Sequence, residues 1–186
     1  MLTVAIIGAG PLGRRLALLA ARSGHRVLLE DVMPANLHHA RESLRRQLAS
    51  EVHEKSSDSA PGVGFVSTIE DAVREADLAI DCVPDELESK LEIFCLLDRM
   101  APPRTVLVTP TTRLSIADLA ACTYRAEQCV ALAAEAGDLA ERDPRVGSEE
   151  LLLRTTAGTR QETINLVKGF WQTLGFTPRF EVDPGT

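Results

Sequence analysis

The residue types with the clearest chemical meaning lie near the start of the chain. Gly8, Gly10 and Gly13 form a G-x-G-x-x-G pattern. The pattern directly follows the apolar run 4–7 and directly precedes a segment with helical spacing. Glycine permits a tight turn, and a residue without Cβ lets a phosphate approach the backbone. Because the next helix would also present free N–H groups and its positive dipole end, the pattern predicts a site for a nucleotide diphosphate.

An acidic pair, Glu30 and Asp31, closes the second apolar run. It lies about 20 residues after the glycines, where a ribose hydroxyl needs an acceptor, and we choose Asp31 over Glu30 for that role. A carboxylate there repels a 2′-phosphate, and no arginine directly follows it, so NAD is favoured over NADP. FAD uses the same fingerprint and stays open, as does a glycine turn that serves geometry without any ligand. Pro11 and Leu12 complete the predicted contacts of the turn.

The elements that must position these residues alternate along the chain. Short, often β-branched runs lie at 3–7, 26–30, 64–66, 78–83, 106–109, 129–133, 151–155 and 179–182. Segments with helical spacing or capping signals lie at 11–23, 34–55, 69–76, 85–100, 116–121 and 160–174, whereas 56–62 and 137–150 read as loops. Strands that alternate with helices predict an α/β, Rossmann-type, doubly wound and mostly parallel sheet with helices on both faces, in a single domain over 1–186.

The composition narrows the classes of partner. The net charge of −7 repels nucleic acid and anionic lipid, so we expect neither as a partner. The four cysteines have no C-x-x-C spacing, which indicates neither a metal site nor disulfides. No apolar stretch reaches the roughly 20 residues of a membrane span, and the first residues lack signal-peptide features. A cytoplasmic location without membrane contact is the expectation.

Further blocks of sequence point to a family. Residues 76–85 read Ala-Asp-Leu-Ala-Ile-Asp-Cys-Val-Pro-Asp, residues 90–94 read Lys-Leu-Glu-Ile-Phe, and residues 114–116 read Leu-Ser-Ile. Together with the glycine turn, the Ser-Gly-His at 23–25 and Asp31, these blocks resemble the NAD-binding domain of the L-3-hydroxyacyl-CoA dehydrogenases. The resemblance covers nearly all of the chain. It implies NAD as cofactor and, as activity, the oxidation of a 3-hydroxyacyl thioester in fatty acid metabolism.

The resemblance also implies roles for single residues. It places Cys82, Val83 and Pro84 beside the dinucleotide, at the end of a strand. Lys90 matches a family lysine near the cofactor and the substrate, and Asp85 matches a family acid. The alternative is that Asp85 caps the following helix and that Lys90 is a solvated surface lysine.

The positions between 110 and 151 that the resemblance places around the reacting group depart from the family. Thr112 falls where the family has a serine that faces the reacting centre, and Pro110 replaces an asparagine. Ala133 occupies the position of the histidine that acts as general base. The partner glutamate of that histidine falls on Leu151, or on Glu150 if the register shifts by one. Because alanine has no proton to exchange, the family's acid–base step cannot run through this position.

Replacements for the lost base are few. Glu135 lies two residues beyond Ala133, so on a strand it would point to the same face. Together with Thr112 and Lys90 it forms the candidate catalytic set. The sequence offers no orienting partner to any histidine, and we interpret all four as ordinary solvated or half-buried side chains. These are His25, His38, His39 and His53.

Two functions of different classes remain open. The first is an oxidoreductase that has rebuilt its acid–base machinery or borrows a helical domain from a partner. The second is a non-catalytic NAD(H)-binding sensor or scaffold. Residues 182–185 match the junction to the family's helical second domain, so we expect that domain to be absent and a homodimer or a partner to replace it. The resemblance implies an acyl-CoA-like second ligand. A relative of the hydroxyisobutyrate or phosphogluconate dehydrogenases fits 81–94 less well.

Overall fold

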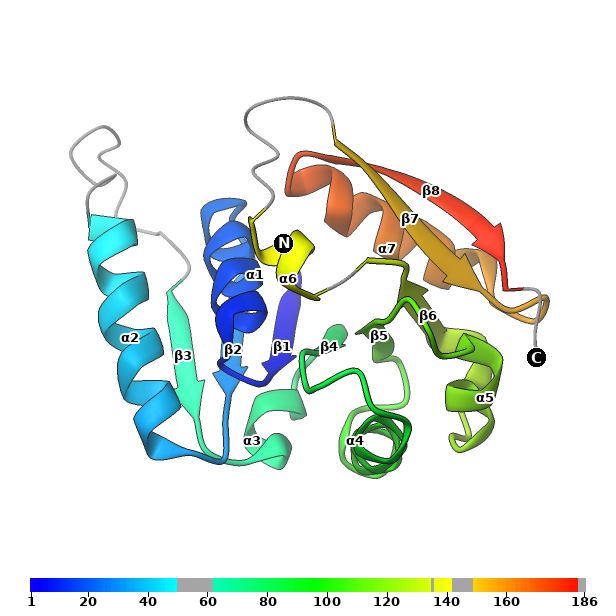
Figure 1. Ribbon diagram of the computed structural model, residues 1–186, viewed down its shortest axis with the longest axis horizontal. Helices are drawn as coiled ribbons and strands as arrows, with labels where there is room; N and C mark the ends of the chain where they lie inside the picture. The colour runs from blue at the N-terminus through cyan, green and yellow to red at the C-terminus, as the bar shows by residue number, and fades with distance from the viewer. Residues whose placement is uncertain (50–61, 135, 142–148, 184–186) are drawn as a thin grey trace.

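The computed structural model describes residues 1–49, 62–134, 136–141 and 149–183. Its strands are β1 (Thr3–Ile7), β2 (Arg26–Glu30), β3 (Val63–Val66), β4 (Leu78–Asp81), β5 (Val106–Pro110), β6 (Cys129–Leu132), β7 (Glu149–Thr155) and β8 (Phe176–Val182). They form one sheet in the order β3-β2-β1-β4-β5-β6-β7-β8 (Figure 1). Only β6 and β7 pair antiparallel among these neighbours. The predicted α/β, mostly parallel Rossmann-type sheet is confirmed.

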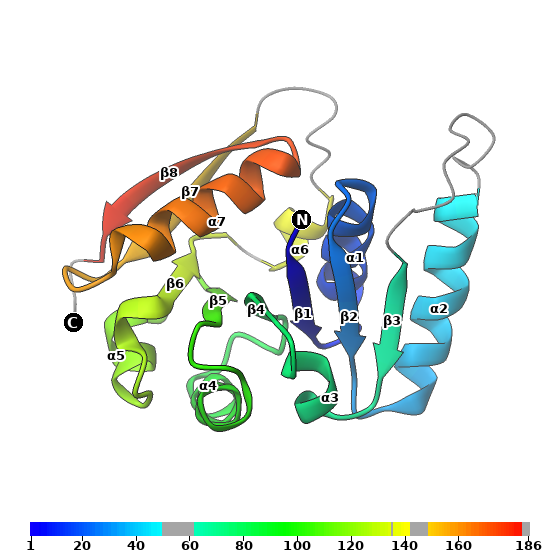
Figure 2. The same cartoon turned by 180° about the vertical axis from the view of Figure 1, so that it is seen from behind.

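Helices cover both faces of this sheet. One face packs against α1 (Pro11–Arg22), α2 (Pro34–Ala49), α6 (Ala136–Glu141) and α7 (Gln161–Thr173). The other packs against α3 (Ile69–Val73), α4 (Leu87–Met100) and α5 (Ile116–Ala121). Figures 1 and 2 show the second group together along one side of the strands. A short 3₁₀ turn, Ala126–Gln128, precedes β6. Within the described residues, no helix is long and apolar enough to span a bilayer.

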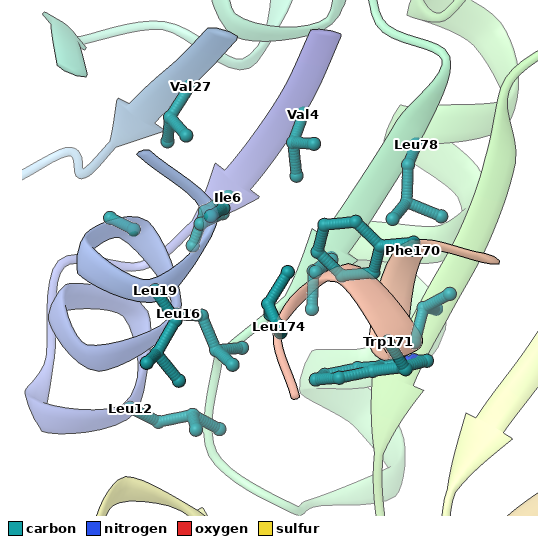
Figure 3. Close-up of a cluster of buried hydrophobic side chains, with 14 of the residues drawn as sticks. Val4, Ile6, Leu12, Leu16, Leu19, Val27, Leu78, Phe170, Trp171 and Leu174 are labelled. Atoms are coloured by element: carbon teal, nitrogen blue, oxygen red, sulfur yellow. The ribbon is translucent and has the colours of Figure 1, made fainter. Parts of the chain in front are cut away.

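The two faces divide the apolar side chains of each strand between two cores. In β1, Val4 and Ile6 belong to the core under α1 and α7, whereas Ala5 and Ile7 belong to the opposite core. This split follows from the two-residue period of a strand. In the first core, Phe170 and Trp171 of α7 lie near the strands and α1 (Figure 3). Because both faces are buried, the strands read as continuous apolar runs in the sequence.

The predicted loop over 137–150 is wrong at both ends. Its first part belongs to α6, and its last two residues begin β7. The side chain of Leu139 is 1% exposed and packs in the core beside α1. A helix of one or two turns shows no apolar period and is unstable alone, so packing against α1 decides its structure. Residues 142–148 of that segment, and 50–61 of the expected second helix and loop, lie outside the described residues.

The last strand is longer than the sequence predicts. It begins at Phe176 rather than at position 179, and it pairs with β7 along its whole length. Pro178 lies inside it, where the missing N–H is tolerated because β8 is an edge strand.

Candidate functional site

A pocket of about 460 Å³ opens at the carboxyl ends of the parallel strands. Ligands of open α/β sheets bind at this edge. Most of the residues predicted to contact a dinucleotide line this pocket: Gly8, Gly10, Pro11, Leu12, Asp31, Cys82, Val83 and Pro84. Asn36, Asp85, Pro110, Ala134 and Gly137 also line it. Gly13 and Lys90 do not line it and act from behind its wall.

The structure gives a different reason for glycine at each of the three positions of the turn. Gly8 has φ +103°, a conformation that L side chains rarely adopt. A Cβ on Gly13 would lie 1.8 Å from the carbonyl oxygen of Gly8, so the close approach of α1 requires glycine there. Gly10 has φ −65°, and a Cβ on it would meet nothing within 4 Å. The fold therefore does not require glycine at position 10, whereas a ligand against the backbone would.

The carboxylate of Asp31 is tied to the glycine turn. The Ala9 N–H donates to Asp31 Oδ2 at 2.9 Å, and the Met33 N–H donates to Oδ1 at 2.8 Å. The Nδ2 of Asn36 lies 3.2 Å from Oδ1 and 3.1 Å from Oδ2. These contacts hold a negative charge beside the pocket at the end of β2, where the sequence predicts a ribose acceptor. Asn36 was missed because its side chain reaches Asp31 only through the turn into α2.

Glu30 differs from its neighbour. It is 6% exposed and does not line the pocket, whereas Asp31 does. Burial, and then the adjacent charge of Asp31, raise the pKa of Glu30 to about 7. The choice of Asp31 over Glu30 as the acceptor is thus consistent with the geometry.

Lys90 is buried behind the wall that Cys82 and Val83 form. Its Nζ lies 3.1 Å from Asp81 Oδ2, donates to Thr109 Oγ1 at 2.9 Å, and lies 3.4 Å from the Val83 carbonyl oxygen. Both Lys90 and Asp81 are 0% exposed. The alternative interpretation of Lys90 as a solvated surface lysine is therefore wrong. Burial raises the pKa of Asp81, and the charge of Lys90 acts in the opposite direction.

The same network shapes the wall itself. Asp81 Oδ1 accepts the Val83 N–H at 2.9 Å, and Thr109 Oγ1 donates to Asp81 Oδ2 at 2.9 Å. Asp81 and Lys90 thus hold the N–H and the carbonyl of Val83 from below. Burial raises the pKa of the Cys82 thiol, which keeps it protonated at neutral pH.

Asp85 lies at the rim of the pocket. Its Oδ1 is buried and has no hydrogen-bond partner among the described residues, and its Oδ2 lies 3.9 Å from the Nε of Arg113. Glu86, not Asp85, occupies the N-cap position of α4, and its side chain makes no capping hydrogen bond, so the interpretation of Asp85 as the helix cap is wrong. Arg113 Nη2 donates to the Asp85 carbonyl oxygen at 2.7 Å, which fixes the turn between β4 and α4.

The ends of β5 and β6 carry the residues predicted at the reacting end. Ala133 follows β6, and its N–H donates to the Leu152 carbonyl oxygen at 2.9 Å. Leu151, one of the two residues that the resemblance aligns with the partner glutamate, is 1% exposed in the apolar core. Thr112 is half-buried and does not line the pocket. Glu135 lies outside the described residues.

His25 corrects one expectation. It is 4% exposed, its Nδ1 accepts the Leu2 N–H at 3.1 Å, and its Nε2 lies 2.7 Å from Thr173 Oγ1. Burial, and then the charged N-terminus, lower its pKa. The interpretation of His25 as a solvated or half-buried side chain is wrong, because Leu2, just before β1, and Thr173 of α7 hold it in a buried position. His25 therefore ties elements together at the edge of the sheet opposite the pocket.

His38 and His39 are exposed on α2, and His53 lies outside the described residues. No group of three histidine, cysteine or acidic side chains in the described part of the chain is placed to hold a metal ion.

The parallel sheet, the glycine turn and the acid at the end of β2 together define a Rossmann-type domain. The model of the family described as 3-hydroxyacyl-CoA dehydrogenase, NAD binding domain, matches residues 3–133. The chain therefore belongs to this family.

Known proteins resemble the chain in sequence and in structure. A probable 3-hydroxybutyryl-CoA dehydrogenase of Bacillus subtilis is 32% identical over 136 residues, which cover 69% of this chain and 47% of that protein. The mitochondrial hydroxyacyl-coenzyme A dehydrogenase of Sus scrofa is 30% identical, with 94% of this chain and 57% of that protein covered. The crystal structure of 3-hydroxybutyryl-CoA dehydrogenase from Escherichia coli superposes with a TM-score of 0.81 at 26% identity. It covers 98% of this chain and 38% of that one. The chain thus spans about half the length of the first two relatives.

Proposed function

We propose that this chain is an NAD(H)-binding domain that holds the dinucleotide in the pocket at the carboxyl ends of β1, β2 and β4. The observation that carries the proposal is Gly10. A Cβ there meets no atom of the described residues within 4 Å, so this part of the protein has no need of glycine at the position. A diphosphate resting on the N-terminus of α1 would fill the space that a Cβ takes.

The remaining contacts follow from the lining of the pocket. Gly8, Pro11 and Leu12 surround the diphosphate, and Gly13 lets α1 approach β1. Asp31 accepts the hydroxyls of the adenosine ribose. Cys82, Val83 and Pro84 form the opposite wall, and Lys90 supports that wall from the buried side. The carboxylate of Asp31 disfavours a 2′-phosphate, which supports NAD over NADP.

The family supplies hydride chemistry through the nicotinamide of the bound cofactor, while the protein binds and orients it. The resemblance aligns Ala133 with the family's general base. It aligns the partner glutamate with Leu151, an apolar core residue, or with Glu150 if the register shifts by one. We therefore propose that the chain does not complete the family's proton transfer by itself. This favours the non-catalytic NAD(H)-binding module over an enzyme rebuilt around Glu135, Thr112 and Lys90, because Lys90 is fully buried in an ion pair.

A second ligand and a partner belong to the same proposal. An acyl-CoA-like molecule, and a helical domain from a partner or a homodimer, would complete a dehydrogenase around the nucleotide. An assay of NADH oxidation with acetoacetyl-CoA separates the two classes. Tight NADH binding without turnover identifies the module, and turnover by the chain alone contradicts our proposal.

The test of the nucleotide site is a fluorescence titration with NADH. The Gly10→Ala variant should bind NADH at least about tenfold more weakly than the parent, because its Cβ occupies the place of the diphosphate. Its thermal stability should equal that of the parent, since the added atom meets nothing. Gly169→Ala on α7 is the matched control, because its Cβ also meets nothing and lies on another element. A parent protein that ignores NADH at millimolar concentration would contradict the proposal.

A further inference from the structure

The carboxylate of Asp31 has no acceptor position left for a ligand. A carboxylate offers about four acceptor positions on its two oxygens. The Ala9 N–H and the Met33 N–H take one position on each oxygen, and the Nδ2 of Asn36 lies within 3.2 Å of both. Asp31 itself is only 8% exposed. A ribose with two hydroxyl donors therefore needs one of these three donors to leave.

Two of the three donors are fixed by the backbone. Ala9 lies in the glycine turn and is 0% exposed, so its N–H cannot turn away without remodelling the site. The Met33 N–H belongs to the turn that leads into α2, and the Met33 carbonyl oxygen accepts the Asn36 N–H at 3.0 Å. The third donor is a side-chain amide. Asn36 is exposed, lies in the first turn of α2 and lines the pocket, so rotation of its side chain releases Asp31 without any change of backbone.

We propose that the amide of Asn36 is an internal stand-in for the ribose hydroxyls and limits the preference of this site for NADH over NADPH. It donates to both oxygens of Asp31, and the hydroxyls of the adenosine ribose compete with it for these acceptors. This inference rests on the proposed NAD(H) site and adds a specificity-determining residue to it. Each molecule of NADH that binds must first replace a hydrogen bond that the protein already makes.

The competition affects NADH and NADPH differently. NADH brings both ribose hydroxyls to Asp31, so it gains most when Asn36 is removed. NADPH carries a phosphate in place of the 2′ hydroxyl donor, and the negative charge of Asp31 repels it whether Asn36 is present or not. Asn36 therefore weakens the binding of NADH more than that of NADPH, and it narrows the preference of the site for NADH.

The test compares the parent, Asn36→Ala and Asn165→Ala in titrations followed by nicotinamide fluorescence. Asn36→Ala should bind NADH about three- to tenfold more tightly than the parent, because a hydrogen bond to a charged group no longer has to be broken. Its affinity for NADPH should stay within about twofold of the parent value, so the ratio of the two affinities widens. Asn165 is an exposed helical asparagine on α7 whose Oδ1 accepts from Gln161 Nε2 at 2.9 Å, and its alanine variant controls for helix propensity.

Three results would overturn the inference. Unchanged or weaker NADH binding by Asn36→Ala would show that the amide organises the site instead of competing for it. An equal gain for NADPH would show that removal of the side chain only opens space. A parent protein that binds neither nucleotide would overturn the proposed function and this inference with it, whereas a parent that binds NADH leaves the first two results to decide on Asn36 alone.

Discussion

The carboxyl ends of β1 and β2 and those of β5 and β6 lie at the same edge of the sheet but are equipped differently. At the first pair, the glycine turn meets a carboxylate that backbone N–H groups orient within 3 Å. At the second pair we propose that Ala133 and either the buried Leu151 or its neighbour Glu150 take the positions of the family's acid–base residues. The residues proposed to bind the dinucleotide and the positions aligned with the family's acid–base pair therefore lie on different strands. Residues at the ends of β5 and β6 can therefore change while the sheet and the glycine turn persist.

The largest expected effect tests whether the glycine turn serves the fold or the ligand. Gly13→Ala should destabilise the protein by about 4 kcal/mol or prevent folding, because its Cβ would lie 1.8 Å from a backbone oxygen. Gly10→Ala in the same turn should leave the free energy of unfolding within about 0.5 kcal/mol of the parent. Chemical denaturation followed by circular dichroism measures both. Similar values for the two variants would contradict the division of roles within the turn.

The buried network of Asp81, Lys90 and Thr109 lies between the two regions and should give the next largest effect. Lys90→Met leaves the carboxylate of Asp81 buried without its ion pair, which should cost about 3–5 kcal/mol of stability. The double variant Asp81→Asn with Lys90→Met removes both charges and should recover part of the loss. The free energy of unfolding in urea tests this. A single variant as stable as the parent would mean that the wall of the pocket does not depend on the pair.

Glu30 offers a pH-dependent test inside the nucleotide-binding region. Its pKa in the folded protein is raised from 4.5 to about 7, so the folded protein holds a proton that the unfolded chain has already released in this range. Stability therefore falls as the pH rises from 4.5 to 7. Relative to Glu30→Gln, which stays neutral, the parent should lose roughly 2–3 kcal/mol between pH 4.5 and pH 8. Parallel stability curves for the two proteins would show that this carboxyl titrates normally.

The smallest expected effect concerns the second region. Ala133→His restores one residue of the family's acid–base pair but leaves Leu151 in the core, so we expect no oxidation of NADH by acetoacetyl-CoA. The affinity for NADH should change by less than about twofold, because Ala133 does not line the pocket. A gain of turnover would mean that the region lacks only a single residue. The comparison would then have to be revised.

The local signals of the sequence locate most of this site. Gly8, Gly10 and Asp31 are recognisable because a tight turn, a backbone approach and an acceptor each demand a residue type at a given spacing. Asn36 carries no such signal, since an exposed asparagine in the first turn of a helix is common. The burial of Lys90 could not be predicted either. Lys90 lies on α4, and its partner Thr109 lies on β5, 19 residues further along the chain.

The sequence by itself determined the alternation of strands and helices, because a strand covered on both faces must be apolar throughout and each turn needs its own residue types. It also determined the glycine turn and the acid that follows it. Only the tertiary structure decided that residues 136–141 form a helix against α1. It also decided that Leu2 and Thr173 hold His25, and that the amide of Asn36 donates to the carboxylate of Asp31. These features depend on contacts between residues far apart in the chain or across a turn, and such contacts leave no period or spacing in the sequence.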